Sequence, residues 1–259
     1  MLTFFRKLRR SFLASGSAGK YLAYAVGEIM LVVIGILIAL QINNWNERRL
    51  KQQDEYVLLE ELYTTLVGDL EHQQGEIQIN LDSRRAIAFL LERLEADAPY
   101  SDSLPFYFSK AHGRGHGLLR AHAYEKAKAH GLEFLQTDSL KELLTWTYEV
   151  NTDWLAELNQ RNNLFENETV IPSLTPLFDA VYITDIFDNL QKRAEPEFPD
   201  RVMAPLDFEA LKRNQAYLSI LRTTAFKRKE FLFFQQRRFR RMLRLREMLQ
   251  QELSLKQNL

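Results

Sequence analysis

The stretch YLAYAVGEIMLVVIGILIALQI occupies residues 21–42 and is apolar around its whole circumference as a helix, apart from the carboxylate of Glu28. As a helix, these roughly 22 residues measure about 33 Å, enough for the roughly 30 Å hydrocarbon core of a bilayer. A cleavable signal peptide has a shorter apolar run followed by a small-residue cleavage site, and this stretch has neither. It therefore predicts one transmembrane helix.

The residues on either side of this helix predict its orientation. Tyr21 and Tyr24 lie near one end and Trp45 at the other, as in the aromatic belts of membrane interfaces. Residues 1–20 contain no acidic residue but several basic ones, Arg6, Lys7, Arg9, Arg10 and Lys20. The positive charge favours a cytoplasmic N-terminus and an extracytoplasmic domain over residues 43–259.

The basic segment 1–20 admits two interpretations. It forms an interfacial helix that contacts anionic membrane lipids through Arg6, Lys7, Arg9 and Arg10, or it is a disordered tail that only sets the topology. The sequence leaves both open.

The run from Lys20 to Glu47, with Gly27-Glu28-Ile29 and LVVIGILIALQINNWNE over residues 31–47, resembles the N-terminal signature of a family of single-pass membrane proteins of unknown function from Gram-negative bacteria. Residues 124–126, 130–132 and 138–140 are similar to a second, weaker motif of that family. The resemblance implies a single-pass membrane protein of a Gram-negative bacterium. Together with the charge bias, it predicts an inner-membrane protein with a periplasmic domain. It implies no catalytic residues.

The remaining chain predicts an all-α fold, an antiparallel helical bundle with long first and last helices. Leu58, Leu59, Leu62, Leu66 and Leu70 recur at helical spacing, so we expect the first helix to continue from the membrane to about Ala96. Further helices are expected over residues 119–130, from Ser139 to just before Ile171-Pro172, from Asp207 to about Thr223, and from Ala225 onward. Val150 and Trp154 are expected on the inner side of the helix that starts at Ser139.

Two charge blocks suggest how the long helices pair. Residues 52–83 lack Lys and Arg and carry Asp54, Glu55, Glu60, Glu61, Asp69, Glu71, Glu76 and Asp82. Between Arg222 and Arg246 the charged residues are basic except for Glu230. We expect the two helices to lie antiparallel with these blocks opposed, although each exposed ion pair contributes only about 0–1 kcal/mol.

Small residues in the apolar stretch form a candidate surface for helix association. Ala23, Gly27, Gly35 and Ala39 are spaced by four or eight residues beside Glu28, a pattern that lets two membrane helices approach closely. A carboxylate within a membrane helix either binds a polar group of a neighbouring helix, lies near the headgroups, or takes part in ion or proton movement. The pattern favours a homo-oligomer or contact with another membrane protein.

Four of the chain's five histidines, His112, His116, His122 and His130, fall within one short segment. Clustered imidazoles can bind zinc, but this spacing matches no standard metal motif, so these residues are weak candidates and we assign no metal. The sequence contains no cysteine, no phosphate-binding glycine loop and no nucleophile motif. It implies no cofactor and no catalytic residues.

The preferred interpretation is a non-catalytic membrane module that serves an interaction, accessory or sensing role and oligomerises through its anchor. Lys+Arg and Asp+Glu both number 34, and this balance argues against a nucleic-acid partner. The alternatives are a channel or transporter subunit that uses Glu28, and a metal-dependent enzyme that uses the histidines of residues 112–130.

Overall fold

The structure, a computed structural model, describes residues 18–181 and 203–257. The chain divides into two compact units, Met1–Val57 and Leu58–Leu259, and each is described by itself. Arg6, Lys7, Arg9 and Arg10 lie outside the described residues, as do the side chains of Tyr21, Ala23 and Tyr24.

Helix α2 (Ala18–Glu95) contains the apolar stretch. It is the one helix in the described part of the chain that is long and apolar enough, by length and composition, to cross a membrane. In the first unit the large apolar side chains from Val26 to Ile42 are exposed, and a Cβ added at Gly27 or Gly35 would meet nothing within 4 Å. The continuous helix agrees with the expectation for residues 21–96, while association through Gly27, Glu28, Gly35 and Ala39 stays a prediction.

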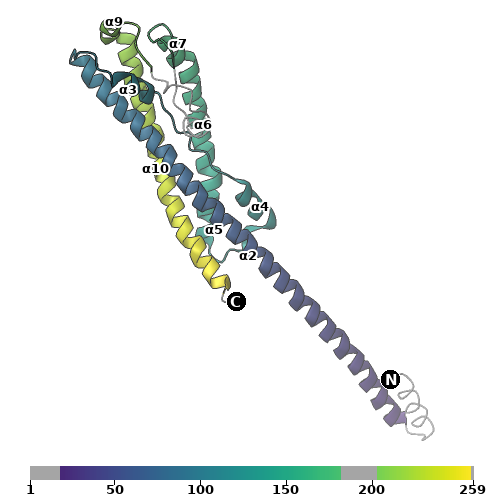
Figure 1. Cartoon of the computed structure of the whole chain (residues 1–259). Coiled ribbons are helices and arrows are strands. Elements are labelled where there is room, and N and C mark those ends of the chain that lie inside the picture. Colours follow the sequence, from purple (N-terminus) through teal and green to yellow (C-terminus); the bar gives the residue numbers. More distant parts are fainter. Residues whose placement is uncertain (1–17, 182–202, 258–259) are drawn as a thin grey trace, which may run out of the picture. The chain divides into compact units, whose positions relative to one another are not determined.

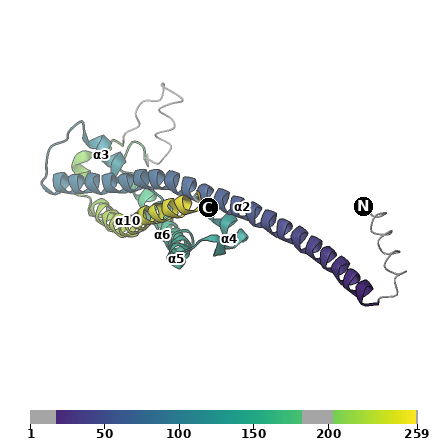
Figure 2. The same cartoon turned by 90° about the horizontal axis from the view of Figure 1, so that it is seen from below.

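The second unit is all-α, as expected (Figure 1). Its shorter helices are α3 (Leu104–Ala111), α4 (His122–His130), the 3-10 turn η1 (Leu132–Phe134) and α9 (Phe208–Lys212), and its last helix is α10 (Gln215–Gln257). An isolated bridge pairs Phe178 with Pro205. Figures 1 and 2 both show α10 running beside the second half of α2.

Residues 138–174 form a continuous helical segment made of α5 (Asp138–Thr145), η2 (Trp146–Val150), α6 (Asn151–Phe165), η3 (Glu166–Val170) and α7 (Ile171–Leu174). The turns η2 and η3 are π-helical. The expected end before Ile171-Pro172 is wrong, because the Ile171 N–H donates to the Glu166 carbonyl in the wider π turn just before the proline. In an α-helix a proline ring clashes with the carbonyl four residues earlier, and the wider π turn relieves this clash at Pro172.

The first π turn also changes which residues of this segment are buried, so the expected inner face is wrong. An added residue in η2 shifts the helical phase, so Leu155 is buried where Trp154 was expected, and Asn151 is buried where Val150 was expected. Val150 and Trp154 are 48% and 55% exposed.

Helix boundaries elsewhere also differ from expectation. Asp207 caps a helix as expected, its carboxylate accepting from the Ala210 N–H over 3.0 Å, but that helix ends at Lys212 and α10 begins at Gln215 without a break near Thr223. Helix α5 begins at Asp138, and Ser139 does not cap it. Helix α3 lies within the region expected to be irregular.

The bundle buries two main apolar clusters. One joins Leu58–Leu70 of α2 to α4, α5 and the end of α10, where Met242, Leu245 and Leu249 are fully buried. The other joins Ile87, Leu90 and Leu94 of α2 to α3, α7 and the start of α10. Between them along α2 lies a buried polar layer, which is the candidate site.

Candidate functional site

The inward face of α2 changes from apolar to polar and back again at a constant spacing of three and four residues. Its members are at most 3% exposed and read Leu59, Leu62, Leu66, Asp69, Gln73, Glu76, Asn80, Ser83, Ile87, Leu90 and Leu94. We call the polar part, from Asp69 to Ser83, the polar seam. In a heptad pattern these positions would normally hold apolar residues that pack against a partner helix. Here they face a segment that is not helical.

Residues 112–118, His-Gly-Arg-Gly-His-Gly-Leu, connect α3 to α4 without forming a helix or a strand; we call them the strap. An extended segment of this kind lacks its own backbone ladder, so buried N–H and C=O groups need other partners. The polar seam supplies them in antiparallel order.

Four residues of the seam, Gln73, Glu76, Asn80 and Ser83, bond different points along the strap or its ends. Ser83 Oγ donates to the Ala111 carbonyl over 2.7 Å, and Gln73 Nε2 donates to the Leu118 carbonyl over 2.7 Å. Between them, the Glu76 carboxylate accepts from the backbone N–H groups of His116 and Gly117. The side chains of α2 therefore bond chiefly the main-chain groups of the strap.

Helices α10 and α6 hold the strap from other sides. Arg228 donates from Nε to the Gly113 carbonyl over 3.3 Å and from Nη2 to the His112 carbonyl over 3.4 Å. Arg238 bonds both the Gly117 carbonyl and Gln73 of the seam, and Asn159 Nδ2 donates to the His116 carbonyl over 2.6 Å. The strap thus joins three long helices that are separate in the sequence.

Two of the three glycines of the strap, Gly115 and Gly117, are required by this arrangement. A Cβ at Gly115 would overlap the backbone oxygen of Glu76, so the close approach to α2 excludes any side chain there. Gly117 has a φ of 68°, a left-handed conformation that glycine adopts without steric cost.

Charged and ionisable groups are buried beside the strap. Arg228 and Glu166 lie 3.8 Å apart, nitrogen to oxygen, and are 2% and 9% exposed. Desolvation lowers the pKa of Arg228 to about 10 and raises the pKa of Glu166, although Arg228 opposes the latter change. Burial and the positive charge of Arg228 lower the pKa of His112 to about 3, so its imidazole is neutral near pH 7. Within the described residues, neither ring nitrogen of His112 has a hydrogen-bond partner.

Asp69, the first residue of the seam, belongs to a second set of polar contacts. Asp69, 2% exposed, accepts from Arg120 Nε over 2.9 Å and lies 3.5 Å from the hydroxyl of Tyr148. Burial, followed by the charge of Asp69 and its hydrogen bond, raises the pKa of Tyr148. The Tyr148 ring stacks on Tyr124 with centroids 5.2 Å apart, which joins the polar layer to the first apolar cluster.

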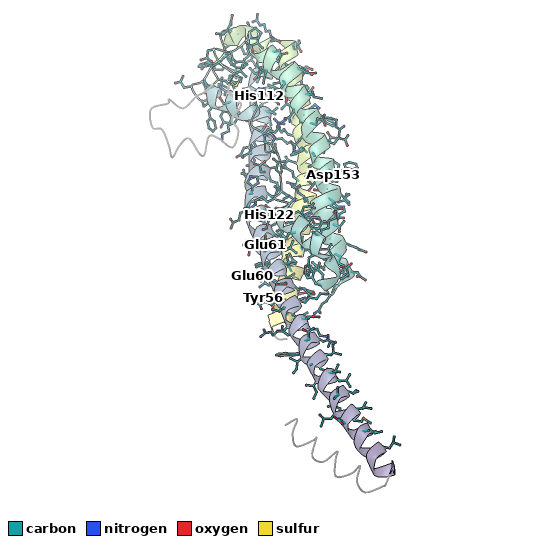
Figure 3. All side chains as sticks on the ribbon, turned by 90° about the vertical axis from the view of Figure 1, so that its right-hand side faces the viewer. Tyr56, Glu60, Glu61, His112, His122 and Asp153 are labelled. Atoms are coloured by element: carbon teal, nitrogen blue, oxygen red, sulfur yellow. The ribbon has the colours of Figure 1, made fainter. Side chains whose placement is uncertain are left out.

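The four clustered histidines do not form a shared site. Figure 3 shows His112 and His122 at different levels of the bundle, and His122 lies 3.7 Å from Glu61. His116 belongs to the strap, whereas His130 packs against the ring of Phe134. Over the described ranges, no group of three or more His, Cys, Asp or Glu side chains could hold a metal ion.

The charge blocks do not pair in the simple way expected. Glu61 binds Lys126 over 2.6 Å and Asp69 binds Arg120, so both acidic residues reach the segment just after the strap instead of α10. On α10, Arg228 binds Glu166 and Arg241 lies 3.7 Å from the centroid of the Trp146 ring. The two long helices bond each other directly through Asn80 with Gln235 and Gln73 with Arg238, and the strap bonds polar side chains of both helices.

The polar seam was not anticipated from the sequence, although a signal for it is present. The spacing of three and four residues continues without interruption from Leu59 to Leu94, and five successive positions within it are polar. Such a block predicts a buried polar partner. The alternating glycines at positions 113, 115 and 117 mark a backbone that can fit closely against helices.

Part of the chain is similar to a known family. Residues 28–93 match a family of unknown function, DUF6090. The matched segment includes most of the apolar stretch and the entire polar seam, and it ends before the strap. None of the curated proteins and none of the solved structures matches the chain.

Proposed function

We propose that this protein is a non-catalytic, single-pass membrane module whose helical bundle serves an interaction or sensing role outside the cytoplasm of a bacterial cell. The observation that carries the proposal is the continuity of α2. One uninterrupted helix contains the exposed apolar residues up to Ile42 and the buried seam from Asp69 to Ser83. The proposed anchor and the seam therefore belong to the same helix.

The use of the buried polar groups supports a role without catalysis. Active sites aim unpaired donors and acceptors at the position of a substrate. Here the side chains of Gln73, Glu76, Asn80 and Ser83 bond the protein's own backbone at the strap. This arrangement is typical of a structural layer that specifies how helices pack.

The membrane anchor also supports an oligomer. Gly27 and Gly35 leave open space at their Cα atoms, and Glu28 lies beside Gly27 on a helix whose apolar side chains have no protein partner in the described structure. We propose that a second membrane helix occupies this face, with the Glu28 side chain bonded to it.

Labelling of introduced cysteines tests the topology, because the natural sequence contains none. Asp102→Cys, in an exposed turn, should react with a membrane-impermeant maleimide in intact spheroplasts, whereas Ser15→Cys should react only after the membrane is opened. The opposite pattern would refute the orientation. Release of the protein by alkaline carbonate would refute the anchor.

A second measurement tests the oligomer. In native mass spectrometry from lipid nanodiscs, the double variant Gly27→Leu, Gly35→Leu should lose the assembly formed by the natural protein, because the larger side chains separate the helices. The double variant Val26→Leu, Ile34→Leu changes neighbouring positions without removing small residues and should keep it. A natural protein that is monomeric would refute the proposal.

A further inference from the structure

An exposed aromatic patch crosses α6 and α10. Trp154 and Phe233 are 55% and 57% exposed, and each lies against the partly buried Phe234, with ring centroids 5.4 and 5.3 Å apart. Val150, 48% exposed, lies one turn before Trp154. We call these four residues the aromatic patch. Contiguous exposed rings of this kind are typical of the centre of a protein interface.

The charges around the patch differ between its two helices. On α6, the exposed Asp153 and Glu157 lie on either side of Trp154 in the sequence, and Figure 3 places Asp153 on this helix. On α10, the exposed side chains that follow Phe233 at helical spacing are basic, Arg237, Arg240 and Arg244.

Two further pairs of charges lie nearby and do not change this contrast. Glu157 is within 3.9 Å of Arg161 on its own helix, at an exposed position where such a pair is weak. Lys229 and Glu230, which precede Phe233, are both exposed and have opposite signs. The α6 side is therefore acidic beside Trp154, and the α10 side is basic beyond Phe233.

From this pattern we infer that the aromatic patch binds a second copy of this chain, related by a two-fold axis parallel to α6 and α10. Such an axis places α6 of one copy opposite α10 of the other and leaves the height along the helices unchanged. Because Trp154 contacts Phe234, Asp153 of each copy then comes within about one helical turn of Arg237 of the other, and this pair of opposite charges occurs twice. A two-fold axis across the helices would instead place acidic α6 against acidic α6. The surface is thus complementary to itself in one of the two orientations.

This interface is separate from the proposed contact between membrane anchors, and it adds a named surface on the bundle. Burial of Trp154 and Phe233 would supply most of the affinity, because aromatic residues at the centre of an interface dominate its energetics. The rim charges would select the parallel orientation and exclude the other one.

Crosslinking of the full chain in native membranes tests the geometry. Benzoylphenylalanine in place of Phe233 keeps an aromatic ring and should form a covalent dimer on irradiation, because this position on α10 faces α6 of the second copy. Benzoylphenylalanine in place of Phe106 is the matched control, since Phe106 is an aromatic residue of α3 with a similar exposure of 52%. Equal crosslinking of the two variants would overturn the proposal.

Charge exchange tests the orientation. With benzoylphenylalanine at position 233 as reporter, Arg237→Glu should strongly reduce the crosslinked fraction, and adding Asp153→Lys should restore it. Failure of the second change to restore crosslinking, while circular dichroism shows an intact helical fold, would overturn the parallel arrangement.

Assembly size separates this interface from the anchor. Phe233→Glu should reduce the assembly measured in nanodiscs, whereas Phe106→Glu should not. An assembly that Phe233→Glu leaves intact and that Gly27→Leu, Gly35→Leu removes would assign association to the anchor alone and overturn the inference.

Discussion

Asn80 and Gly115 are 35 positions apart in the sequence and exchange two hydrogen bonds. The Asn80 side chain donates from Nδ2 to the Gly115 carbonyl over 3.0 Å, and the Gly115 N–H donates to Asn80 Oδ1 over 3.2 Å. Asn80 Nδ2 also lies 2.9 Å from Gln235 Oε1 of α10. One side-chain amide thereby completes the backbone bonding of the strap and joins two long helices.

Asn80→Leu is expected to lower the free energy of unfolding of the bundle by about 2–4 kcal/mol, because it leaves buried backbone groups of Gly115 without partners. The exposed Gln78 bonds only Asp82 on its own helix, so Gln78→Ala should cost less than about 0.5 kcal/mol. Urea unfolding followed by tryptophan fluorescence measures both changes. Equal effects would contradict the importance of the strap.

Gly115→Ala is expected to destabilise the bundle by more than about 2 kcal/mol, since the new methyl group would overlap the Glu76 carbonyl in a well-packed site. Gly75→Ala is the matched control on α2. A Cβ there meets nothing within 4 Å, so alanine should stabilise the helix by up to about 1 kcal/mol. The two alanine variants should therefore shift the midpoint of urea unfolding in opposite directions.

Glu166→Gln is expected to cost about 3–5 kcal/mol of stability, because it leaves the buried charge of Arg228 uncompensated. Adding Arg228→Met should recover part of that loss. The exposed pair of Arg161 and Glu157 provides the control, and Glu157→Gln should change stability by less than about 1 kcal/mol. No recovery in the double variant would show that Arg228 acts mainly through its bonds to the strap.

Stability is expected to fall as the pH is lowered from about 6.5 toward 3, because of His112. Its folded pKa of about 3 is below the ordinary value of 6.5, so in this window the unfolded chain binds a proton that the folded chain does not. The slope contributed by this group approaches about 1.4 kcal/mol per pH unit. Glu166 acts in the opposite direction, since its raised pKa lets the folded state bind a proton more readily.

The variant His112→Leu isolates the contribution of this histidine. It should keep most of its stability at pH 7 and show a shallower loss between pH 6 and 4 than the natural protein. His130→Leu removes an exposed histidine and should leave the slope unchanged. An unaltered slope in His112→Leu would assign the pH dependence to other groups.

Several local features could be read from residues close together in the sequence. The apolar run indicated a long helix, Asp207 indicated a helix start, and Gly131 indicated the end of α4, where its φ is 92°. Each depends on the properties of one helix or one turn. The heptad spacing from Leu59 to Leu94 also contained the polar seam, although the partner of that seam could not be inferred from spacing alone.

Other features depended on contacts between distant segments. The exposure of Trp154 follows from a π turn in η2, and the continuation past Pro172 follows from a second π turn in η3. Neither turn has a sequence signal comparable to a helix cap. The histidines appeared clustered in the sequence, yet the fold buries His112 between helices and leaves His122 exposed beside Glu61.

The sequence by itself determined the helical class and the apolar segment of residues 21–42, because hydrophobic periodicity and turn residues act over a few positions. Only the tertiary structure decided that Asp69, Gln73, Glu76, Asn80 and Ser83 are buried, and that the last four bond the strap or the Ala111 carbonyl just before it. A polar residue is stable inside a protein only where its hydrogen bonds are satisfied. For Gln73, Glu76, Asn80 and Ser83 those bonds come from backbone groups about 30 to 45 positions away, and for Asp69 they come from the side chains of Arg120 and Tyr148.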